Sequence, residues 1–284
     1  MIDETVEEIE DMQTHSSSEV AVTAARALRA ITEEEHATVE EYLRSLSRNA
    51  RALRHANPSH ATLFTTMHAI VDAVEAADPP DLSAAREATT AAIDAEIERV
   101  QAAKDGAAEN AQALLEPGGT YMTLDFSTTL LTALERASDP DEEAITVYCL
   151  ESRPRYLGRK MARSIAGVCG LEAHLVVDGA SGSFVRACDR VLVGMTCIVD
   201  GTLYNRVGTY PLAAVADHAG TPMHAVGART KVVDDAFVFE HEERSASEVS
   251  LEPLPDVAID NPAYDATPVS LVTSVITDEG ALFD

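Results

Sequence analysis

The first 115 residues carry apolar side chains at the three- and four-residue spacing of amphipathic helices. Before the clearest stripes, Ser16 followed by Glu19 fits a capping box that opens a helix over 20–31. Pro79-Pro80 breaks the chain, and a further helix begins near Leu82. The two clearest stripes are Val39, Leu43, Leu46, Ala50 and Leu53, and then Leu63, Met67, Ile70 and Val74. The pattern predicts a helical bundle whose core is built from these stripes.

Beyond Pro117-Gly118-Gly119, short apolar runs alternate with helical patterns. Strands are expected at 121–126, 145–150, 175–177, 190–193 and 223–226, and helices at 128–136, 158–167 and 211–218. This alternation predicts a parallel sheet with right-handed crossovers. The predicted fold class is therefore α/β, with a helical N-terminal domain (1–117) followed by a Rossmann-like parallel-sheet α/β domain (118–284).

Ligands of such sheets bind at the carboxyl ends of the strands, so the residues that follow each strand are candidates for a site. Ser127, Thr128 and Thr129 follow the first strand and open a helix. Their hydroxyl and backbone N–H groups could bind an anion, or they could be ordinary N-terminal caps. Both alternatives stay open at the level of sequence.

Five cations stand at the same predicted edge: Arg153, Arg155, Arg206, Arg229 and Lys231. Arginine and lysine together can hold a phosphate group, which favours an anion-binding role for the set. The alternative is that they neutralise nearby carboxylates, for instance in a salt bridge to Glu151.

Two further residues end predicted strands. Cys149 lies inside this basic edge, where a thiolate could be stabilised, although a cysteine in a buried strand also packs as a small apolar side chain. Asp178 could contact a hydroxyl group or cap the turn through Gly179. From these residues alone, we expect a site for an anionic small molecule on an α/β sheet.

Charge narrows the choice of partners. The chain has 48 acidic and 21 basic residues, a net charge of −27, and only three of the basic residues are lysines. A field this negative argues against binding nucleic acid or a membrane surface.

The arginine-for-lysine bias is typical of an extreme halophile, so acidic runs are interpreted as solvated surface and no metal site is expected. The acidic N-terminus and the absence of a long apolar run predict a cytoplasmic protein.

Common cofactor motifs are missing from the sequence. The four cysteines contain no CxxC pair, and there is neither a GxxxxGK[ST] loop nor a GxGxxG fingerprint. No cofactor is therefore predicted.

Several segments form a recognisable set, namely Cys149–Pro154, Val177-Asp178, Asn205–Thr209, Lys231, 261–268 and 277–280. In these segments the chain resembles the initiation factor 2B alpha/beta/delta superfamily, and both its helical and its α/β parts fit. The resemblance implies one of two kinds of protein. One kind comprises the ribose 1,5-bisphosphate and methylthioribose 1-phosphate isomerases, which use a cysteine and an aspartate. The other comprises the non-catalytic regulatory subunits of translation initiation factor 2B.

The resemblance implies that Cys149 matches the isomerase cysteine, whereas the isomerase aspartate of a Gly-Ala-Asp tripeptide is replaced by Thr196 in Gly194-Met195-Thr196. A threonine hydroxyl cannot act as a carboxylate acid or base. Two arginine-containing phosphate contacts are also replaced, by His15-Ser16-Ser17-Ser18 and by Asn57-Pro58-Ser59.

These replacements favour a non-catalytic, regulatory protein of translation initiation as the first interpretation. Its partly retained pocket for a sugar phosphate or nucleotide would use Ser127, Thr128, Arg153, Asp178, Asn205, Arg206 and Lys231. Self-association to a dimer or larger oligomer is expected, with a translation initiation factor as a candidate partner. The alternative is an aldose–ketose isomerase that acts on a phosphorylated ribose and has moved its acid to another residue.

Overall fold

The computed structural model describes residues 2–10, 16–233 and 237–282. The chain divides into two compact units, one of residues 1–103 with 236–239 and one of residues 104–235 with 240–284. We describe each unit by itself and call them the helical unit and the α/β unit.

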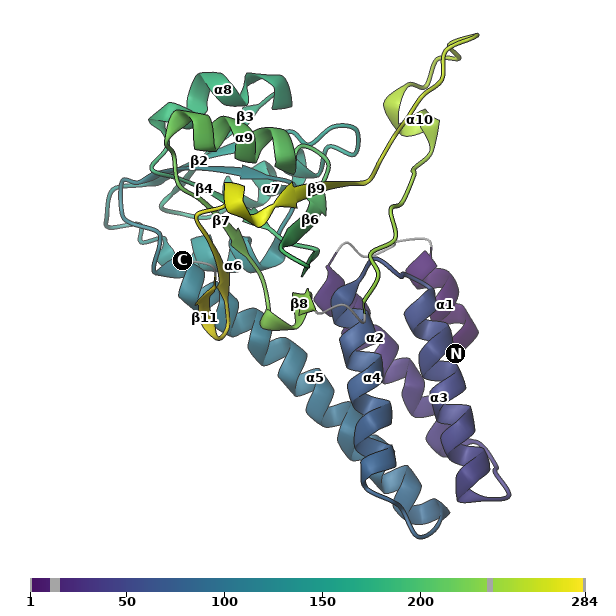
Figure 1. Cartoon of the computed structure of the whole chain (residues 1–284). Coiled ribbons are helices and arrows are strands. Elements are labelled where there is room, and N and C mark those ends of the chain that lie inside the picture. The colour runs from purple at the N-terminus through teal and green to yellow at the C-terminus, as the bar shows by residue number, and fades with distance from the viewer. Residues whose placement is uncertain (1, 11–15, 234–236, 283–284) are drawn as a thin grey trace. The chain divides into compact units, whose positions relative to one another are not determined.

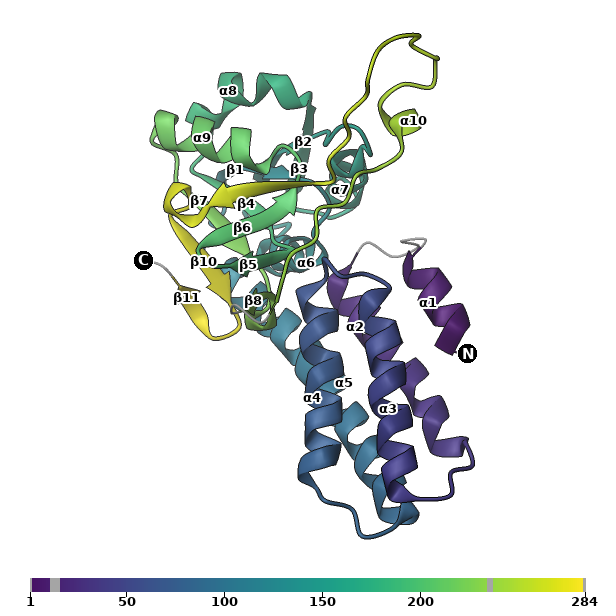
Figure 2. The same ribbon diagram turned by 45° about the vertical axis from the view of Figure 1, so that its right-hand side comes forward.

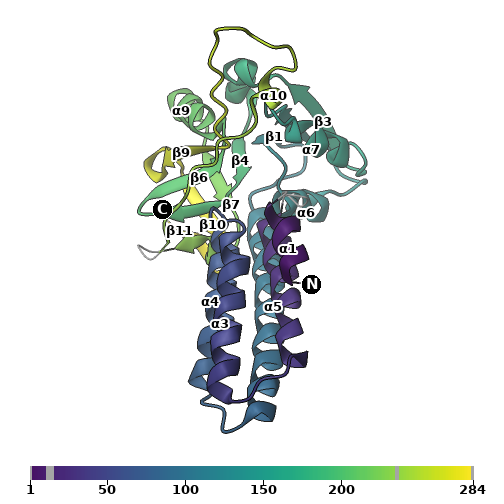
Figure 3. The same cartoon turned by 90° about the vertical axis from the view of Figure 1, so that its right-hand side faces the viewer.

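The helical unit is a bundle of helices that run alongside one another (Figure 3). The helices are α1 (Ile2–Glu10), α2 (Ser17–Leu28), α3 (Val39–His55), α4 (Ala61–Ala76) and the first part of α5 (Leu82–Gln112), with a 3-10 turn at Arg29–Glu33. Ser16 caps α2, because its hydroxyl accepts a hydrogen bond from the Glu19 N–H at 3.5 Å. Both predicted apolar stripes are buried in one core, apart from Leu43, which is partly buried against it, and Val39, which is half-buried at the start of α3 and outside this core. The segment at Phe237 joins this unit, where its ring packs edge-on against Phe64 at 5.2 Å.

The α/β unit is built on a seven-stranded sheet in the order β11-β10-β7-β4-β1-β2-β3 (Figure 1). All neighbouring strands are parallel except β10 and β11. The strands are β1 (Thr120–Leu124), β2 (Ile145–Leu150), β3 (Leu171–Val176), β4 (Arg190–Gly194), β7 (Met223–Val226), β10 (Ser274–Thr277) and β11 (Gly280–Leu282). The predicted parallel α/β fold is thereby confirmed.

Helices cover both faces of this sheet (Figure 2). Side chains alternate between the faces because successive residues of a strand point in opposite directions. Ile145, Val147 and Cys149 of β2 enter one core, whereas Leu150 enters the other. The first core packs against α6 (Thr128–Ala137), α7 (Leu157–Ile165) and the end of α5, and the second against α9 (Thr209–Ala219) and the short α8 (Ser181–Phe184).

A second, four-stranded sheet in the order β8-β5-β6-β9 was not expected from the sequence. Its strands are β5 (Cys197–Val199), β6 (Thr202–Arg206), β8 (Val232–Val233) and β9 (Tyr264–Pro268). Sequence periodicity missed it because β5 and β8 are very short and β6 pairs with β9 far along the chain. Cys197, Asn205 and Arg206 therefore lie in strands of this second sheet.

The two units divide inside α5, between Ala103 and Lys104. Secondary structure changes near the expected boundary at residue 117, since β1 begins at Thr120. The compact units divide earlier because α5 is one continuous helix, capped by Asp81, whose C-terminal residues Ala108 and Ala111 pack into the core of the α/β unit.

The strand order reverses direction between β1 and β4, which is where parallel sheets open a crevice for ligands. The backbone after β1 and that after β4 approach closely there. A Cβ atom on Gly194 would lie 3.0 Å from the Ser127 Cβ, so a larger residue there would push Ser127 aside by a few tenths of an ångström.

Candidate functional site

A pocket opens at the carboxyl ends of β1 and β2 and at the end of β6. It is lined by Asp125, Ser152, Arg153, Pro154, Arg155, Leu157, Arg206, Val207, Arg244, Asn261, Pro262 and Ala263. Four of these twelve residues are arginines, in a chain with more than twice as many acidic as basic residues. The pocket is therefore suited to an anionic ligand.

Asp125 is the carboxyl group of this pocket. It follows the last residue of β1, and its side chain is 16% exposed. Burial raises the pKa of Asp125, although the nearby guanidinium groups of Arg206 and Arg155 and the Phe126 N–H act in the opposite direction. A carboxyl group with a raised pKa in a cleft can both donate and accept a proton near neutral pH.

Arg206 faces Asp125 from the end of β6. Its Nε lies 3.7 Å from the Asp125 Oδ2, and its guanidinium lies over the Tyr264 ring at 4.7 Å. The Arg206 Nη1 is buried and has no hydrogen-bond partner among the residues that the structure describes. A buried donor without a partner is rare in proteins, so this nitrogen is available to a ligand oxygen.

The loop after β2 is held by side chains from neighbouring strand ends. The Ser152 hydroxyl accepts the Asp125 N–H at 2.7 Å, and both carboxylate oxygens of Asp178, beyond β3, accept N–H groups from Ser152 and Arg153. Asp125, Ser152 and Tyr156 adopt φ angles of 67°, 62° and 57°. Left-handed backbone at three non-glycine residues is strained, and such strain gathers at functional sites.

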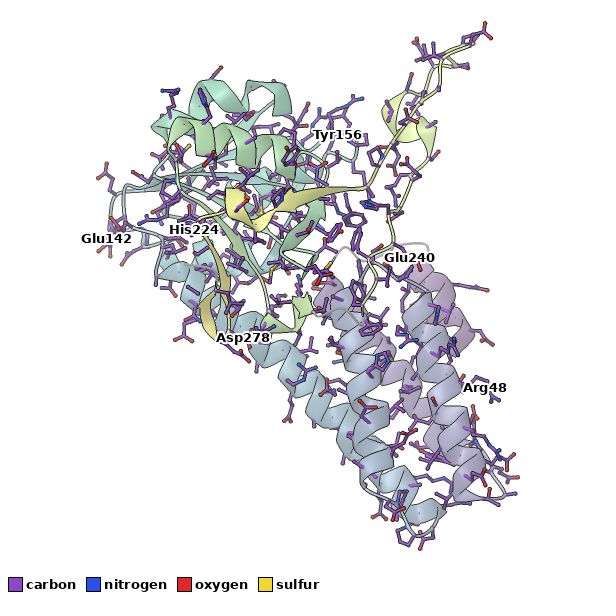
Figure 4. The ribbon with its side chains drawn as sticks, viewed as in Figure 1. Arg48, Glu142, Tyr156, His224, Glu240 and Asp278 are labelled. Atoms are coloured by element: carbon purple, nitrogen blue, oxygen red, sulfur yellow. The ribbon has the colours of Figure 1, made fainter. Side chains whose placement is uncertain are left out.

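Arg153 and Arg155 extend from this loop. Arg153 donates to the Tyr156 hydroxyl at 2.5 Å and to the Val249 carbonyl at 3.0 Å, and it has no carboxylate partner among the described side chains. Tyr156, labelled in Figure 4, lies against the guanidinium groups of both Arg153 and Arg159. Burial and the neighbouring Arg206 and Arg244 lower the pKa of Arg155. Positive charge is thus crowded in the pocket.

Residues 240–262 form a protruding segment, which we call the arm (Figure 1), and its residues Arg244, Asn261 and Pro262 line part of the pocket. Arg244 at its base is ion-paired with Glu242 and Glu248, and these carboxylates raise the Arg244 pKa. Asn261 donates to the Ser245 carbonyl and to Glu248. The space left free is about 20 Å³, which is room for a single water molecule.

The structure brings three of the five predicted cations to one pocket, Arg153, Arg155 and Arg206, and leaves out two. Arg229 pairs with Glu279, and its backbone N–H donates to the Asp278 carboxylate. Lys231 donates to the Met195 carbonyl at 2.8 Å, and burial lowers its pKa to about 8.

The other predicted ligand-binding residues make internal contacts. Ser127 caps α6 through the Leu130 N–H, and Thr128 is the first residue of that helix. The Asn205 amide donates to the Thr209 hydroxyl, which in turn donates to the Arg206 carbonyl. Asn205 and Asp178 therefore position parts of the site without lining it.

The structure places Cys149, the cysteine expected to be catalytic if the protein is an isomerase, away from the pocket. Cys149 is fully buried in the core beneath α7, its thiol points to the Val147 carbonyl, and burial raises its pKa to about 12. Such a thiol neither ionises near neutral pH nor lines the pocket. Thr196 lies between β4 and β5, where its N–H donates to the Tyr204 carbonyl, and it does not line the pocket either.

The replaced phosphate segments lie in the helical unit. His15 is outside the described residues, whereas Ser16 to Ser18 cap and begin α2. Asn57 to Ser59 form part of the connection between α3 and α4.

Sequence reasoning missed Asp125, Ser152, Arg244 and Tyr264. The signal for Asp125 was present, because it is an acidic residue at the end of an otherwise apolar predicted strand. Arg244 and Tyr264 carried no such signal, since only the arm brings Arg244 to the pocket and only the pairing of β6 with β9 brings Tyr264 against Arg206.

Within the described part of the chain, no helix is both long and apolar enough to cross a membrane. The same residues contain no cluster of three histidine, cysteine or acidic side chains arranged to hold a metal ion.

Comparison with known proteins adds a second line of evidence. A family model described as the initiation factor 2 subunit family matches residues 13–283. Ribose 1,5-bisphosphate isomerase from Haloferax volcanii is 30% identical over 97% of this chain and 87% of its own length. Methylthioribose-1-phosphate isomerase from Synechococcus sp. is 29% identical over 97% of this chain and 84% of its own.

Solved structures share the fold. Translation initiation factor eIF-2B from Pyrococcus horikoshii OT3 superposes with a TM-score of 0.82 at 24% identity, covering 99% of this chain and 96% of that one. The tetrameric eIF2B-beta2-delta2 complex from C. thermophilum contains a chain that superposes with a TM-score of 0.76 at 18% identity, covering 99% and 90%.

These relatives correct the first functional interpretation. A non-catalytic regulatory protein was expected, yet well-covered relatives are named as sugar-phosphate isomerases, which favours the isomerase alternative. The family resemblance itself is confirmed: this chain belongs to the initiation factor 2 subunit family.

Proposed function

We propose that this protein is an isomerase that interconverts the aldose and ketose forms of a phosphorylated ribose, of the ribose 1,5-bisphosphate or methylthioribose 1-phosphate type. One observation carries the proposal: the largely buried carboxyl group of Asp125 shares a pocket with four arginines at the carboxyl ends of parallel strands. The names of the relatives support the same reaction class.

Asp125 is the group that moves protons in this proposal. Its raised pKa keeps it protonated to higher pH than an ordinary aspartate, so it donates a proton to the ring oxygen as the C1–O4 bond breaks. The resulting carboxylate takes the proton from C2, which leaves an enol. It returns a proton to C1 and accepts the proton of the C2 hydroxyl, which becomes the ketone. Every proton given is recovered, and the phosphate ester at C1 stays in place.

The arginines hold the phosphate and stabilise the negative charge that develops on the sugar oxygens. Arg206 offers its unpartnered Nη1, and Arg153 has no carboxylate partner among the described residues. Each charge-assisted hydrogen bond of this kind contributes about 1.5–3 kcal/mol. Arg244 contributes less, because Glu242 and Glu248 already neutralise it.

The arm admits substrate and then excludes water. Arg153 in the loop after β2 donates a hydrogen bond to the Val249 carbonyl of the arm, and Leu251 near the tip of the arm is 91% exposed. A sugar phosphate needs far more than 20 Å³, so the arm must swing outward before it closes on the ligand.

We also propose that the chain self-associates. The support is a structural neighbour that belongs to a tetrameric complex. Light scattering in molar KCl should then give a particle heavier than the 30.3 kDa chain.

The isomerase proposal is tested by following ketose formation by NMR, with ribose 1,5-bisphosphate and methylthioribose 1-phosphate in molar KCl. Asp125→Asn keeps the side chain's size and should lower kcat by about 10²–10⁴-fold. Asp217→Asn, on the exposed face of α9, is the matched control, and Cys149→Ala should also retain activity.

Two outcomes are decisive. Absence of turnover of both substrates by the wild-type protein contradicts the isomerase. Turnover that survives Asp125→Asn but is lost in Cys149→Ala keeps the isomerase and overturns Asp125 as its acid and base.

A further inference from the structure

A second cavity, of about 240 Å³, lies in the helical unit between α3 and α4. Its apolar floor is Ala50, Met67 and Val71, and its polar rim includes Arg51, Arg54 and His68. The proposed isomerase uses none of these residues.

The rim contains cations without acidic neighbours. The chain contains 48 acidic residues, yet no carboxylate of the described residues lines the cavity. Among the described residues, neither Arg51 nor Arg54 forms an ion pair with an acidic side chain. Burial and the nearby Arg51 lower the pKa of Arg54, so the two guanidinium groups repel each other. A bound anion would relieve this repulsion.

Arg54 is held in a fixed orientation by contacts that leave part of its guanidinium free. Its Nη1 lies 2.6 Å from the His68 Nε2, and the group stands over the Phe64 ring at 5.1 Å. Because a guanidinium only donates, Nε2 must accept, and the His68 Nδ1 then donates to the Phe64 carbonyl at 3.0 Å. A neutral His68 thus orients Arg54 without neutralising its charge.

The helix dipole accounts for the position of Arg54 but not for that of Arg51 or for the cavity. Cations are favoured in the last turn of a helix, and Arg54 lies in the last turn of α3. Arg51 lies one turn earlier and is exposed, and a dipole effect requires no cavity beside it.

We propose that this cavity binds a phosphate monoester of a small organic molecule. Arg51 and Arg54 contact the phosphate oxygens, since guanidinium groups match phosphate geometry. The organic part of the ligand covers Met67 and Val71 on the apolar floor. The site belongs to the helical unit and is separate from the pocket of Asp125.

The test uses the full chain with Arg206→Gln in the background, so that the α/β pocket binds phosphate poorly. The methionine methyl groups are labelled with ¹³C, and the Met67 signal is assigned through Met67→Leu. Phenyl phosphate in molar KCl should shift this signal in a saturable way, and inorganic phosphate should bind more weakly because it cannot cover the floor.

Arg51→Gln should weaken phenyl phosphate binding by about ten-fold or more. Arg51 is exposed, so its replacement leaves the bundle folded. The matched control is Arg48→Gln, which removes the same charge from α3 at a residue whose guanidinium contacts Ser45 outside the cavity (Figure 4). This control should bind like the parent.

Three results would overturn the proposal. The first is a Met67 signal that phenyl phosphate leaves unmoved. The second is equal weakening by Arg48→Gln and Arg51→Gln, which would indicate a general charge effect. The third is an equal shift with phenol, which would show that the floor binds rings without any need for phosphate.

Discussion

At the scale of single residues, buried ionisable side chains such as Asp125 and Lys231 can take part in chemistry, and they also lower the stability of the folded state. Asp125 has a raised pKa because the fold buries its carboxyl group more effectively than the nearby arginines compensate it. Lys231 is the basic counterpart, since its ammonium group is buried and donates a hydrogen bond to the neutral Met195 carbonyl. Groups of this kind lower stability in the pH range where they are charged.

Lys231 gives a prediction about pH. Its pKa is about 8 in the folded protein, against about 10.4 in an unfolded chain. Below pH 8 the group is charged in both states, so the folded state carries the full burial penalty. Between these pKa values the unfolded chain binds more protons, so stability rises with pH, by about 3 kcal/mol at most at 1.36 kcal/mol per unit. The free energy of unfolding of Lys231→Met should not show this rise with pH.

The measurement is urea unfolding of both proteins at pH 7.5 and pH 10.5 in molar KCl. Lys231→Met should be the more stable protein at the lower pH, and the difference should shrink at the higher one. A difference that does not change with pH would show that the Lys231 side chain is not buried as the structure has it.

At the scale of elements, the site depends on how closely α7 approaches the end of β2. A Cβ atom on Gly158 would lie 1.7 Å from the Leu150 carbonyl oxygen, which is backbone and cannot move away easily. Gly158→Ala should therefore lower the free energy of unfolding by about 3 kcal/mol or more. A Cβ atom on Gly179 would meet no other atom within 4 Å, so Gly179→Ala should change stability little. Equal denaturation midpoints for the two variants would contradict this packing.

The loop after β2 is positioned by Asp178 from beyond β3. Asp178→Asn leaves only one oxygen to accept the N–H groups of Ser152 and Arg153, so this loop should loosen. We expect stability to fall by about 1–3 kcal/mol. The KM for a sugar phosphate should rise more than kcat falls, because in the proposed mechanism Arg153 binds substrate and transfers no proton. Asp217→Asn on α9 is the control for the loss of one negative charge. A fall in kcat with an unchanged KM in Asp178→Asn would argue against a positioning role for Asp178.

At the scale of the whole molecule, charge governs stability. The net charge of −27 is screened in molar salt, where the Debye length is about 3 Å, and much less at 0.1 M, where it is about 10 Å. Thermal unfolding followed by circular dichroism should therefore show a lower Tm at about 0.1 M than at about 1 M KCl. A Tm that rises as salt is removed would contradict the halophilic interpretation of the composition.

The sequence by itself determined the fold class, a helical part followed by a parallel α/β part, but it did not predict the second sheet. Apolar stripes at helical spacing defined α3 and α4, and the predicted 145–150 and 223–226 strands coincide with β2 and β7. These signals are local, because a helix or a buried strand shows its periodicity within a dozen residues. The strand-end arginines were visible for the same reason, since Arg153 and Arg155 follow a clear strand.

Only the tertiary structure decided which of those residues form the site. Arg206 and Tyr264 meet through the pairing of β6 with β9, which joins segments far apart in the sequence. Cys149 and Asp125 both lie at or near a strand end, but the alternation of side chains along β2 sends Cys149 into a core. Burial, which determines whether a thiol or a carboxyl group can take part in chemistry, depends on long-range packing and cannot be read from local pattern.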